Sequence, residues 1–226
     1  MTDNLESHTK VEEQSIRFTS GSLQIEGALH LVDKARQPGI VFCHPHPLFG
    51  GSMDDERGRA ITEGARLQGF NVLRFNFRGV GRSQGTYSNG VGEVQDAVAA
   101  IGFLRQHPHI DSSRVILIGY SFGGSVAIAA AFHTSPAALV TLSAPIRIDQ
   151  ADSTLVTEAL RYVSCPTYII HGSEDMTVSL AEAEAIHAQL QVREKFLRII
   201  KGADHFYLNH LDEVVHKIFA FLTDNI

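Results

Sequence analysis

The stretch that most constrains the fold of this 226-residue chain is residues 115–124, VILIGYSFGG. Four consecutive apolar residues, 115–118, predict a strand buried on both faces, and an apolar helical pattern follows. Between them stands the spacing Gly-x-Ser-x-Gly. A strand that turns sharply into a helix leaves no room for Cβ atoms at Gly119 and Gly123. The pattern therefore predicts that Ser121 is exposed at the carboxyl edge of a sheet, as a candidate nucleophile.

Strands and helices are expected to alternate along the whole chain. Short apolar or alternating runs predict strands, and apolar residues at three- and four-residue steps predict amphipathic helices. The expected strands are residues 14–19, 23–32, 39–43, 71–75, 115–118, 138–142, 167–171 and 195–200. The expected helices are residues 54–68, 91–105, 123–132, 155–162, 180–190 and 211–222.

This order of elements predicts the α/β fold class. The first two strands flank a Gly21-Ser22 turn, so they should pair antiparallel. The later strands alternate with helices, which predicts a mostly parallel, doubly wound central sheet with helices on both faces and right-handed crossovers.

The length of the chain favours a single domain over residues 1–226. A mass of 24.7 kDa fits one α/β domain, and 44% hydrophobic and 19% charged residues are ordinary for a globular protein. Residues 1–14 are polar and are expected to be flexible. Residues 143–166 lack a strand pattern, and an interval of only 24 residues can form a short cap or flap but not a large cap domain.

Charge and hydropathy exclude several kinds of partner. The formal net charge is −6 without a run of Lys or Arg, so no nucleic-acid partner is expected. No apolar run approaches the roughly 18 residues of a membrane span, and residues 1–8 lack the features of a secretory signal. A cytoplasmic protein is expected, and an oligomer is compatible with the sequence. Cys43 and Cys165 lie beside strand-like residues, which favours buried thiols over a disulfide.

Three segments resemble the α/β-hydrolase superfamily. Residues 119–123 resemble its nucleophile elbow, residues 172–178 (GSEDMTV) its acid loop Gly-x-x-Asp-x-x-Val, and residues 202–206 (GADHF) its histidine loop. The resemblance implies a catalytic triad of Ser121, Asp175 and His205, in the chain order of that family. Chemically, a serine hydroxyl needs an imidazole to take its proton, and a carboxylate must hold the imidazole in the productive tautomer.

Other residues near the triad have alternative interpretations. Glu174 is a second candidate for the acid, and Asp175 is also suited to cap the next helix. Asp204 is interpreted as a loop-shaping residue because it is too near His205 in sequence. Most of the other eleven histidines are interpreted as ordinary loop residues, and His210 and His216 are expected to be solvated or at helix ends.

The oxyanion site needs two amide donors. The resemblance implies Phe122, which follows the nucleophile, and a donor from the loop after strand 39–43. Many relatives have His-Gly-x in that loop, whereas this chain has residues 44–47, HPHP. By position the donor is His46; Pro47 has no N–H, which leaves Leu48 as the alternative.

The phrase HPHP and the segments that follow resemble a small, largely lidless group of bacterial α/β-hydrolases. Residues 48–53 and 74–81 resemble that group as well, and the resemblance spans about residues 39–210. A His-x-His pair at His44 and His46 is also an alternative metal site, but no third ligand has suitable spacing, so no metal and no cofactor are expected. Arg78 and Arg82 are alternative binding residues for an anionic group.

The resulting prediction is a serine hydrolase that cleaves carboxylic esters through an acyl-serine intermediate. The short interval 143–166 predicts an open site that favours small or short-acyl esters as small-molecule substrates. The expected apolar lining is Leu48, Phe49, Phe122, Met176, Phe206 and Tyr207. The alternatives are a thioesterase, peptidase, acyltransferase or C–C hydrolase with the same triad, or a noncatalytic binding protein of this fold. A dienelactone-hydrolase-like enzyme is disfavoured, because that group uses Cys as nucleophile, and a metal hydrolase would use His44 and His46.

Overall fold

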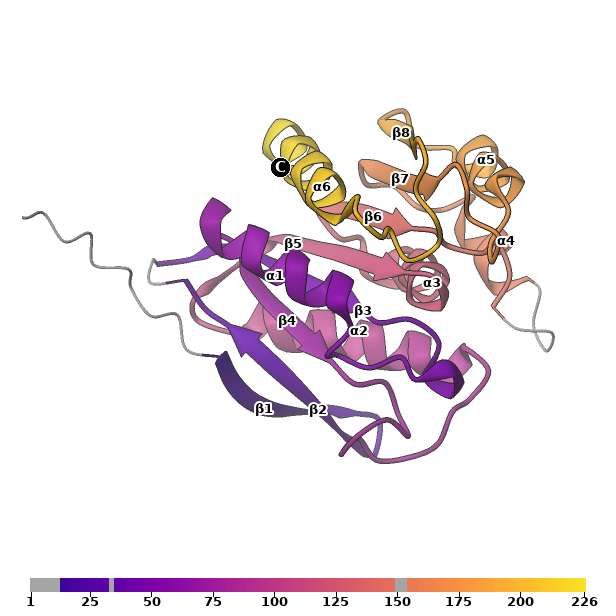
Figure 1. Cartoon of the computed structure of the whole chain (residues 1–226). Coiled ribbons are helices and arrows are strands. Elements are labelled where there is room, and N and C mark those ends of the chain that lie inside the picture. The colour runs from indigo at the N-terminus through magenta and orange to yellow at the C-terminus, as the bar shows by residue number, and fades with distance from the viewer. Residues whose placement is uncertain (1–12, 33–34, 149–153) are drawn as a thin grey trace, which may run out of the picture.

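A computed structural model describes residues 13–32, 35–148 and 154–226 (Figure 1). The flexibility expected for residues 1–14 concerns mainly residues 1–12, which lie outside this part of the chain, as do residues 149–153 of the expected cap segment. The strands are β1 Glu13–Ser20, β2 Leu23–His30, β3 Gln37–Cys43, β4 Asn71–Phe75, β5 Ile110–Tyr120, β6 Ala138–Leu142, β7 Thr167–Gly172 and β8 Lys195–Ile200. The helices are η1 Pro47–Phe49, α1 Glu56–Gln68, α2 Val91–Gln106, α3 Phe122–Thr134, α4 Leu155–Ala159, α5 Leu180–Gln189 and α6 Leu211–Asn225.

Within the described residues, eight strands form one sheet in the order β1-β2-β4-β3-β5-β6-β7-β8. β1 and β2 pair antiparallel, as predicted, and β2 is also antiparallel to β4. Every other pair is parallel. The predicted α/β class with a mostly parallel sheet is therefore confirmed.

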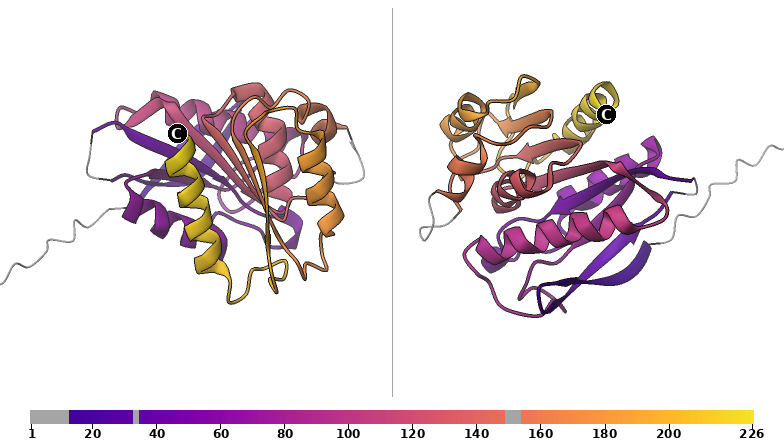
Figure 2. Two further views of the ribbon diagram at one scale, coloured as in Figure 1. Left: turned by 90° about the horizontal axis from the view of Figure 1, so that it is seen from above. Right: turned by 180° about the vertical axis from the view of Figure 1, so that it is seen from behind.

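Helices cover both faces of the sheet, and each face has its own core. α1 and α6 lie in front of the sheet in Figure 1, and α2 and α3 lie in front of it in the view from behind (Figure 2). Side chains of β5 alternate between these cores: Ile116 and Ile118 pack with α1 and α6, whereas Val115 and Leu117 pack with α2 and α3. This explains why a continuous apolar run forms this strand, since both of its faces are buried.

The boundaries of several elements differ from the predictions. β5 begins at Ile110, five residues before the expected start, because Ile110 pairs with Gln37 across an irregular register and extends the strand through polar residues. α4 ends at Ala159 rather than at Tyr162. α6 extends to Asn225, three residues beyond the prediction.

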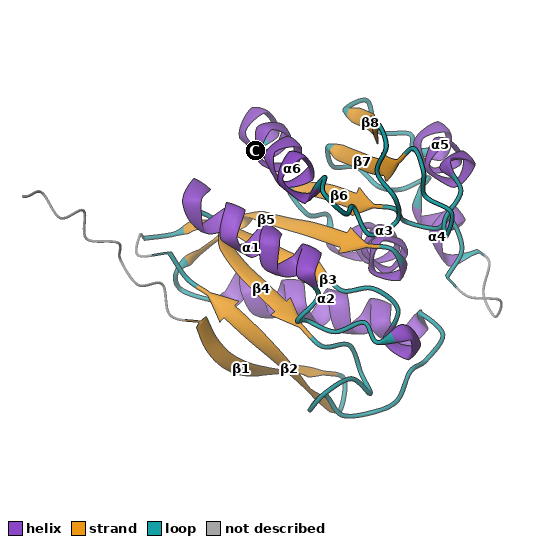
Figure 3. Ribbon diagram, in the orientation of Figure 1, coloured by secondary structure: helices purple, strands orange, loops and turns teal. Residues whose placement is uncertain are grey.

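The parallel strands deliver their following loops to one edge of the sheet. The arrowheads of β5 and β6 point the same way in Figure 3, and the segments after β3, β5, β7 and β8 emerge at that end. These are the segments that carry the residues of the nucleophile elbow, the oxyanion loop, the acid loop and the histidine loop. Parallel topology thus brings together residues that are far apart in the sequence.

The start of α3 packs directly against the end of β3. A Cβ atom on Gly123 would collide with the carbonyl oxygens of Cys43 and His44. A Cβ atom on Gly119 would collide with the carbonyl of Gly123 itself. The two glycines of the motif are therefore required by backbone contacts, for the reason expected from the sequence.

We predict that Gly123→Ala lowers the free energy of unfolding by about 1–3 kcal/mol, because the added methyl group meets rigid backbone. The matched control is Gly102→Ala in the interior of α2, where a Cβ atom meets nothing within 4 Å. This control should be neutral or stabilising by up to about 1 kcal/mol, since Ala is the better helix former. Urea unfolding measures both, and equal effects would contradict the prediction.

Candidate active site

Ser121 occupies the turn between β5 and α3 in a strained backbone conformation. Its φ is 53° and its ψ is −124°, a combination that costs a non-glycine residue about 1–3 kcal/mol. The amide of Ser121 donates to the carbonyl of Leu142 on β6 (2.8 Å), and its own carbonyl accepts from Gly124 (2.8 Å). These bonds hold the residue in place while its side chain faces a cavity.

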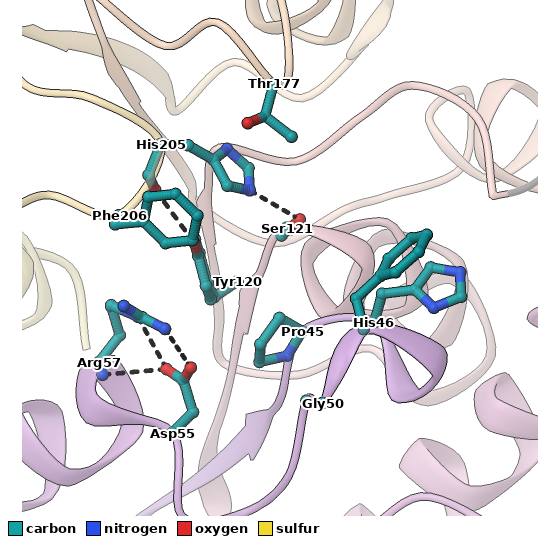
Figure 4. Close-up of a pocket in the computed structure, with 12 residues that line it drawn as sticks. Pro45, His46, Gly50, Asp55, Arg57, Tyr120, Ser121, Thr177, His205 and Phe206 are labelled. Carbon is teal, nitrogen blue, oxygen red and sulfur yellow. Dashed lines mark hydrogen bonds and ion pairs between the residues drawn. The ribbon is translucent and has the colours of Figure 1, made fainter.

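The structure brings Ser121, His205 and Asp175 into one hydrogen-bonded row. Nε2 of His205 lies 3.1 Å from Oγ of Ser121 (Figure 4), and Nδ1 lies 2.8 Å from Oδ2 of Asp175. An ionised carboxylate only accepts, so Nδ1 carries a proton and Nε2 of the neutral ring accepts from the serine hydroxyl. The imidazole is thereby held in the tautomer that can take a proton from Ser121.

Asp175 is held ionised by donors from its own loop and from neighbours. Oδ1 accepts the amides of Thr177 (2.9 Å) and Val178 (2.8 Å). Burial alone would raise the pKa of Asp175, but the hydrogen bonds from His205, Val178 and the hydroxyl of Ser143 outweigh it and lower the pKa to about 2. The carboxyl group is thus charged at neutral pH.

Glu174 and Asp204, the other acidic residues near the triad, do not bond the His205 ring. Glu174 is exposed, and the residue that bonds His205 is Asp175. Oδ1 of Asp204 accepts the amide of Leu208 (3.1 Å), which fits its interpretation as a loop-shaping residue.

The nucleophile strand also fixes the histidine loop. The hydroxyl of Tyr120 donates to the carbonyl of His205 (3.1 Å), and the two rings lie 5.3 Å apart. Glu174 donates its amide to the carbonyl of Ala203 (2.9 Å), which joins the acid loop to the histidine loop. A backbone hydrogen bond therefore ties the two loops to each other, and the Tyr120 side chain ties the histidine loop to β5.

His44 is a structural residue of the loop after β3. It is completely buried; its Nδ1 donates to the carbonyl of Pro45 (2.7 Å) and its Nε2 accepts the amide of Phe77 (3.0 Å). Burial lowers the pKa of His44 to about 4. Both ring nitrogens serve backbone groups, so His44 is not placed as a metal ligand.

His46 lies beside the candidate nucleophile and packs against Phe122, with ring centroids 4.8 Å apart. Its Nδ1 accepts the amide of Leu48 (3.2 Å), and its Nε2 lies 3.2 Å from the hydroxyl of Tyr87. The alternative oxyanion donor Leu48 therefore directs its N–H to the His46 ring. Phe122 is the first residue of α3, where backbone N–H groups have no partner inside the helix.

A cavity of about 380 Å³ opens over Ser121. Its lining includes His46, Phe49 and Phe206 of the expected site, whereas Leu48 and Met176 are exposed and are not among its lining residues. Phe122 and Tyr207 are buried in the core. Further lining residues that the sequence did not indicate are Pro45, Gly50, Gly51, Asp55, Arg57, Tyr120 and Thr177.

The sequence marks Arg57 as unusual for its helix but does not indicate where its side chain lies. It follows a helix N-cap, Asp55, and a cation in the first turn opposes the helix dipole. A residue that is unfavourable for its own helix is often placed for another purpose. Arg78 and Arg82, the alternative anion-binding residues suggested by the sequence, do not line the cavity; Arg78 forms a two-pronged ion pair with the buried Asp96.

Cys43 and Cys165 are both buried and free, as predicted. Burial raises the pKa of both thiols, which keeps them protonated. Among the described residues, no group of three or more His, Cys, Asp or Glu side chains is placed to hold a metal ion. In the same part of the chain, no helix combines the length and apolar character needed to cross a membrane.

Comparisons with known proteins agree with this fold. The chain belongs to the α/β-hydrolase family, whose domain model matches residues 40–214. An uncharacterized protein of Rickettsia prowazekii is 30% identical over 92% of this chain and 87% of its own length.

Two solved structures are similar over nearly the whole chain. An α/β serine hydrolase homologue from Coxiella burnetii has a TM-score of 0.80 at 26% identity, covering 94% of this chain and 97% of its own. An α/β serine hydrolase without a lid from Xanthomonas campestris has a TM-score of 0.80 at 26% identity, covering 94% of each chain. The chain is accordingly a hydrolase of the α/β type.

We predict that His44 makes the protein sensitive to acid. Its pKa is about 4 in the folded state and about 6.5 when unfolded, so as pH falls the unfolded state binds a proton that the native state excludes. Between pH 7.5 and 4.5 this costs about 2.5 kcal/mol of stability. His44→Asn, which keeps a donor and an acceptor without titrating, should reduce the pH dependence by that amount.

Urea unfolding at the two pH values measures this dependence. The control is His216→Asn on α6, since water reaches that exposed side chain in the folded state. It should keep the pH dependence of the wild type. An unchanged pH dependence in His44→Asn would contradict the assignment.

Proposed function

We propose that this hydrolase cleaves small carboxylic esters through an acyl-serine intermediate on Ser121. The observation that carries the proposal is the row Ser121–His205–Asp175, with 3.1 Å and 2.8 Å between successive partners. It supplies a nucleophile, a base and an orienting acid in the order that this chemistry requires.

In the first half of the proposed reaction, His205 Nε2 takes the proton of Ser121 as Oγ attacks the ester carbonyl carbon. The carbonyl π bond opens and places a negative charge on its oxygen. Asp175 remains ionised and stabilises the imidazolium that forms, for which its low pKa is suited. The tetrahedral intermediate then collapses, the bond to the alcohol breaks, and His205 returns the proton to the departing oxygen.

In the second half, water takes the place of the alcohol. His205 removes a proton from the water as its oxygen attacks the acyl-serine carbonyl. Collapse of the second tetrahedral intermediate breaks the bond to Ser121, whose Oγ recovers the proton, and the carboxylic acid is released. No cofactor takes part in this sequence.

Two backbone amides are proposed to hold the oxyanion. Phe122 presents its N–H at the start of α3, where the helix dipole also favours negative charge. His46 is the proposed second donor, because Pro47 has no N–H and the Leu48 amide bonds the His46 ring. Phe122 directly follows Ser121 in the chain, and its ring lies 4.8 Å from that of His46, so both proposed donors belong to residues near Ser121.

The small volume of the cavity and its open entrance favour small substrates. A volume of about 380 Å³ is near the lower end for ligand sites. No described residue of the interval 143–166 lines it, so in this part of the chain no cap lengthens the pocket. Phe49 and Phe206 supply apolar surface at the entrance for a short acyl group.

We predict that Ser121→Ala and Asp175→Asn each lower kcat/KM for a small ester by at least about 10⁴-fold. The first removes the nucleophile, and the second leaves the imidazole in the wrong tautomer. Glu174→Gln is the matched control, because Glu174 is an exposed neighbour in the same loop, and it should stay within about twofold of the wild type.

A fluorophosphonate probe tests the nucleophile independently of the substrate. The wild type should form an adduct on Ser121 that mass spectrometry locates, and Ser121→Ala should form none. Absence of the adduct in the wild type would favour a noncatalytic protein. If the probe labels Ser121 but the enzyme rapidly cleaves thioesters or peptides and not esters, the protein is a thioesterase or a peptidase and the ester proposal is wrong.

We predict that kcat/KM for 4-nitrophenyl esters is highest for acyl chains of two to about four carbons and falls at longer chains. Additional methylene groups find no enclosing wall and gain little of the roughly 0.8 kcal/mol available per buried CH₂. The measurement is a chain-length series at one pH. An optimum at long chains would overturn the argument from the open cavity.

A further inference from the structure

A guanidinium group lines the same cavity as Ser121 but has no part in the proposed acyl transfer. Arg57 is the second residue of α1, and only 11% of its side chain is exposed. Figure 4 shows its guanidinium between the carboxylate of Asp55 and the ring of Phe206, on the His205 side of the cavity.

Aromatic rings and one carboxylate hold this guanidinium in a fixed orientation. Its Cζ atom lies 4.6 Å from the ring centroid of Tyr120 and 5.9 Å from that of Phe206. Such cation–π contacts stabilise a desolvated guanidinium and restrict its rotation. Tyr120 precedes the nucleophile and Phe206 follows the base, so Arg57 is held by the immediate neighbours of the proposed catalytic residues.

Among the described residues, the side-chain hydrogen bonds of Arg57, which lines the cavity, use only part of its donor capacity. Nε donates to Oδ1 of Asp55 (2.9 Å), and Nη2 donates to Oδ2 of the same carboxylate. Among the described residues Nη1 makes no hydrogen bond; Oε2 of the exposed Glu56 lies 3.9 Å from it. A guanidinium has five N–H groups, so the edge formed by Nη1 and the second N–H of Nη2 can still take two oxygens.

Helix and core stability do not account for Arg57. A cation in the first turn is repelled by the helix dipole. A buried ion pair such as Arg57–Asp55 is also weak evidence for stability, because desolvation offsets much of the attraction. By contrast, a desolvated guanidinium whose geometry is fixed in advance is well suited to bind a planar anion.

We propose that Arg57, oriented by Asp55, is a receptor for a carboxylate group carried by the substrate. The inference rests on the proposed function, which it narrows from small esters in general to small esters bearing a carboxylate. Two oxygens of that group bind the Nη1/Nη2 edge while the ester carbonyl lies at Ser121. Asp55 already neutralises the charge of Arg57, so recognition depends chiefly on paired hydrogen bonds.

The carboxylate of the substrate can belong to its acyl part or to its alcohol part. Two pairs of substrates distinguish these positions. Monoethyl succinate carries it on the acyl side, and its uncharged isostere is ethyl 4-methylpentanoate. Acetoxyacetate carries it on the alcohol side, and its isostere is isobutyl acetate. Titration of the released acid at constant pH gives kcat/KM for all four esters.

For each pair, kcat/KM for the carboxylate-bearing ester is divided by kcat/KM for its uncharged isostere. We predict that Arg57→Gln lowers this ratio by about 10-fold or more for at least one pair, because hydrogen bonds to a charged group are lost. Arg57→Lys keeps the charge without the planar fork and should recover only part of the ratio. Arg66→Gln on the same helix removes an exposed arginine that pairs with Glu63, and it should leave the ratio at the wild-type value.

If Arg57 had only a structural role, its replacement would lower kcat/KM equally for both esters of a pair, and that result would overturn the inference. Thermal unfolding of each variant reports any loss of stability. The double variant Asp55→Asn/Arg57→Gln avoids leaving a buried carboxylate unpaired.

A second test is succinate binding, which calorimetry measures without any turnover. Binding that Arg57→Gln weakens about 10-fold supports the receptor, and equal binding by both proteins refutes it. If the wild type cleaves none of the esters, the proposed function fails and succinate binding decides the inference alone.

Discussion

The close approach of α3 to the end of β3 is the constraint on which the site depends. Gly123 lies against the carbonyls of Cys43 and His44, and any side chain there would separate the two segments. Because they meet, the strained turn at Ser121, the first amide of α3 and the loop that carries His46 share one corner of the sheet edge. Packing of backbone against backbone therefore sets the geometry in which a hydroxyl can react.

Near this corner, the buried side chains of His44 and Asp175 differ in charge. His44 is neutral because burial makes its protonation unfavourable, and it uses both ring nitrogens to shape the loop. Asp175, in contrast, is ionised, because its amide, imidazole and hydroxyl donors outweigh the effect of burial on its pKa. The proposed reaction creates charge on the imidazole and the substrate, so donors fixed beforehand need little reorganisation.

Much of this arrangement could be predicted from the sequence, because its signals are local. The apolar run 115–118 defines the buried strand, and the glycines around Ser121 define the turn. The places of Arg57 and Tyr120 could not be read in this way, since they depend on how α1 packs beside β5 and the histidine loop. Leu48 and Met176 illustrate the converse, because apolar character alone does not determine whether a loop side chain faces the cavity or the solvent.

The hydrogen bond from Tyr120 to the carbonyl of His205 has a mechanical consequence. Tyr120 is covalently joined to Ser121, so the alcohol and the imidazole are anchored to one rigid strand even though 84 positions separate them in the sequence. When the segment after β8 shifts, this tether limits how far the ring can drift from the oxygen. The distance between the Ser121 oxygen and the His205 nitrogen therefore depends less on motions of the surrounding loops than on the geometry of β5.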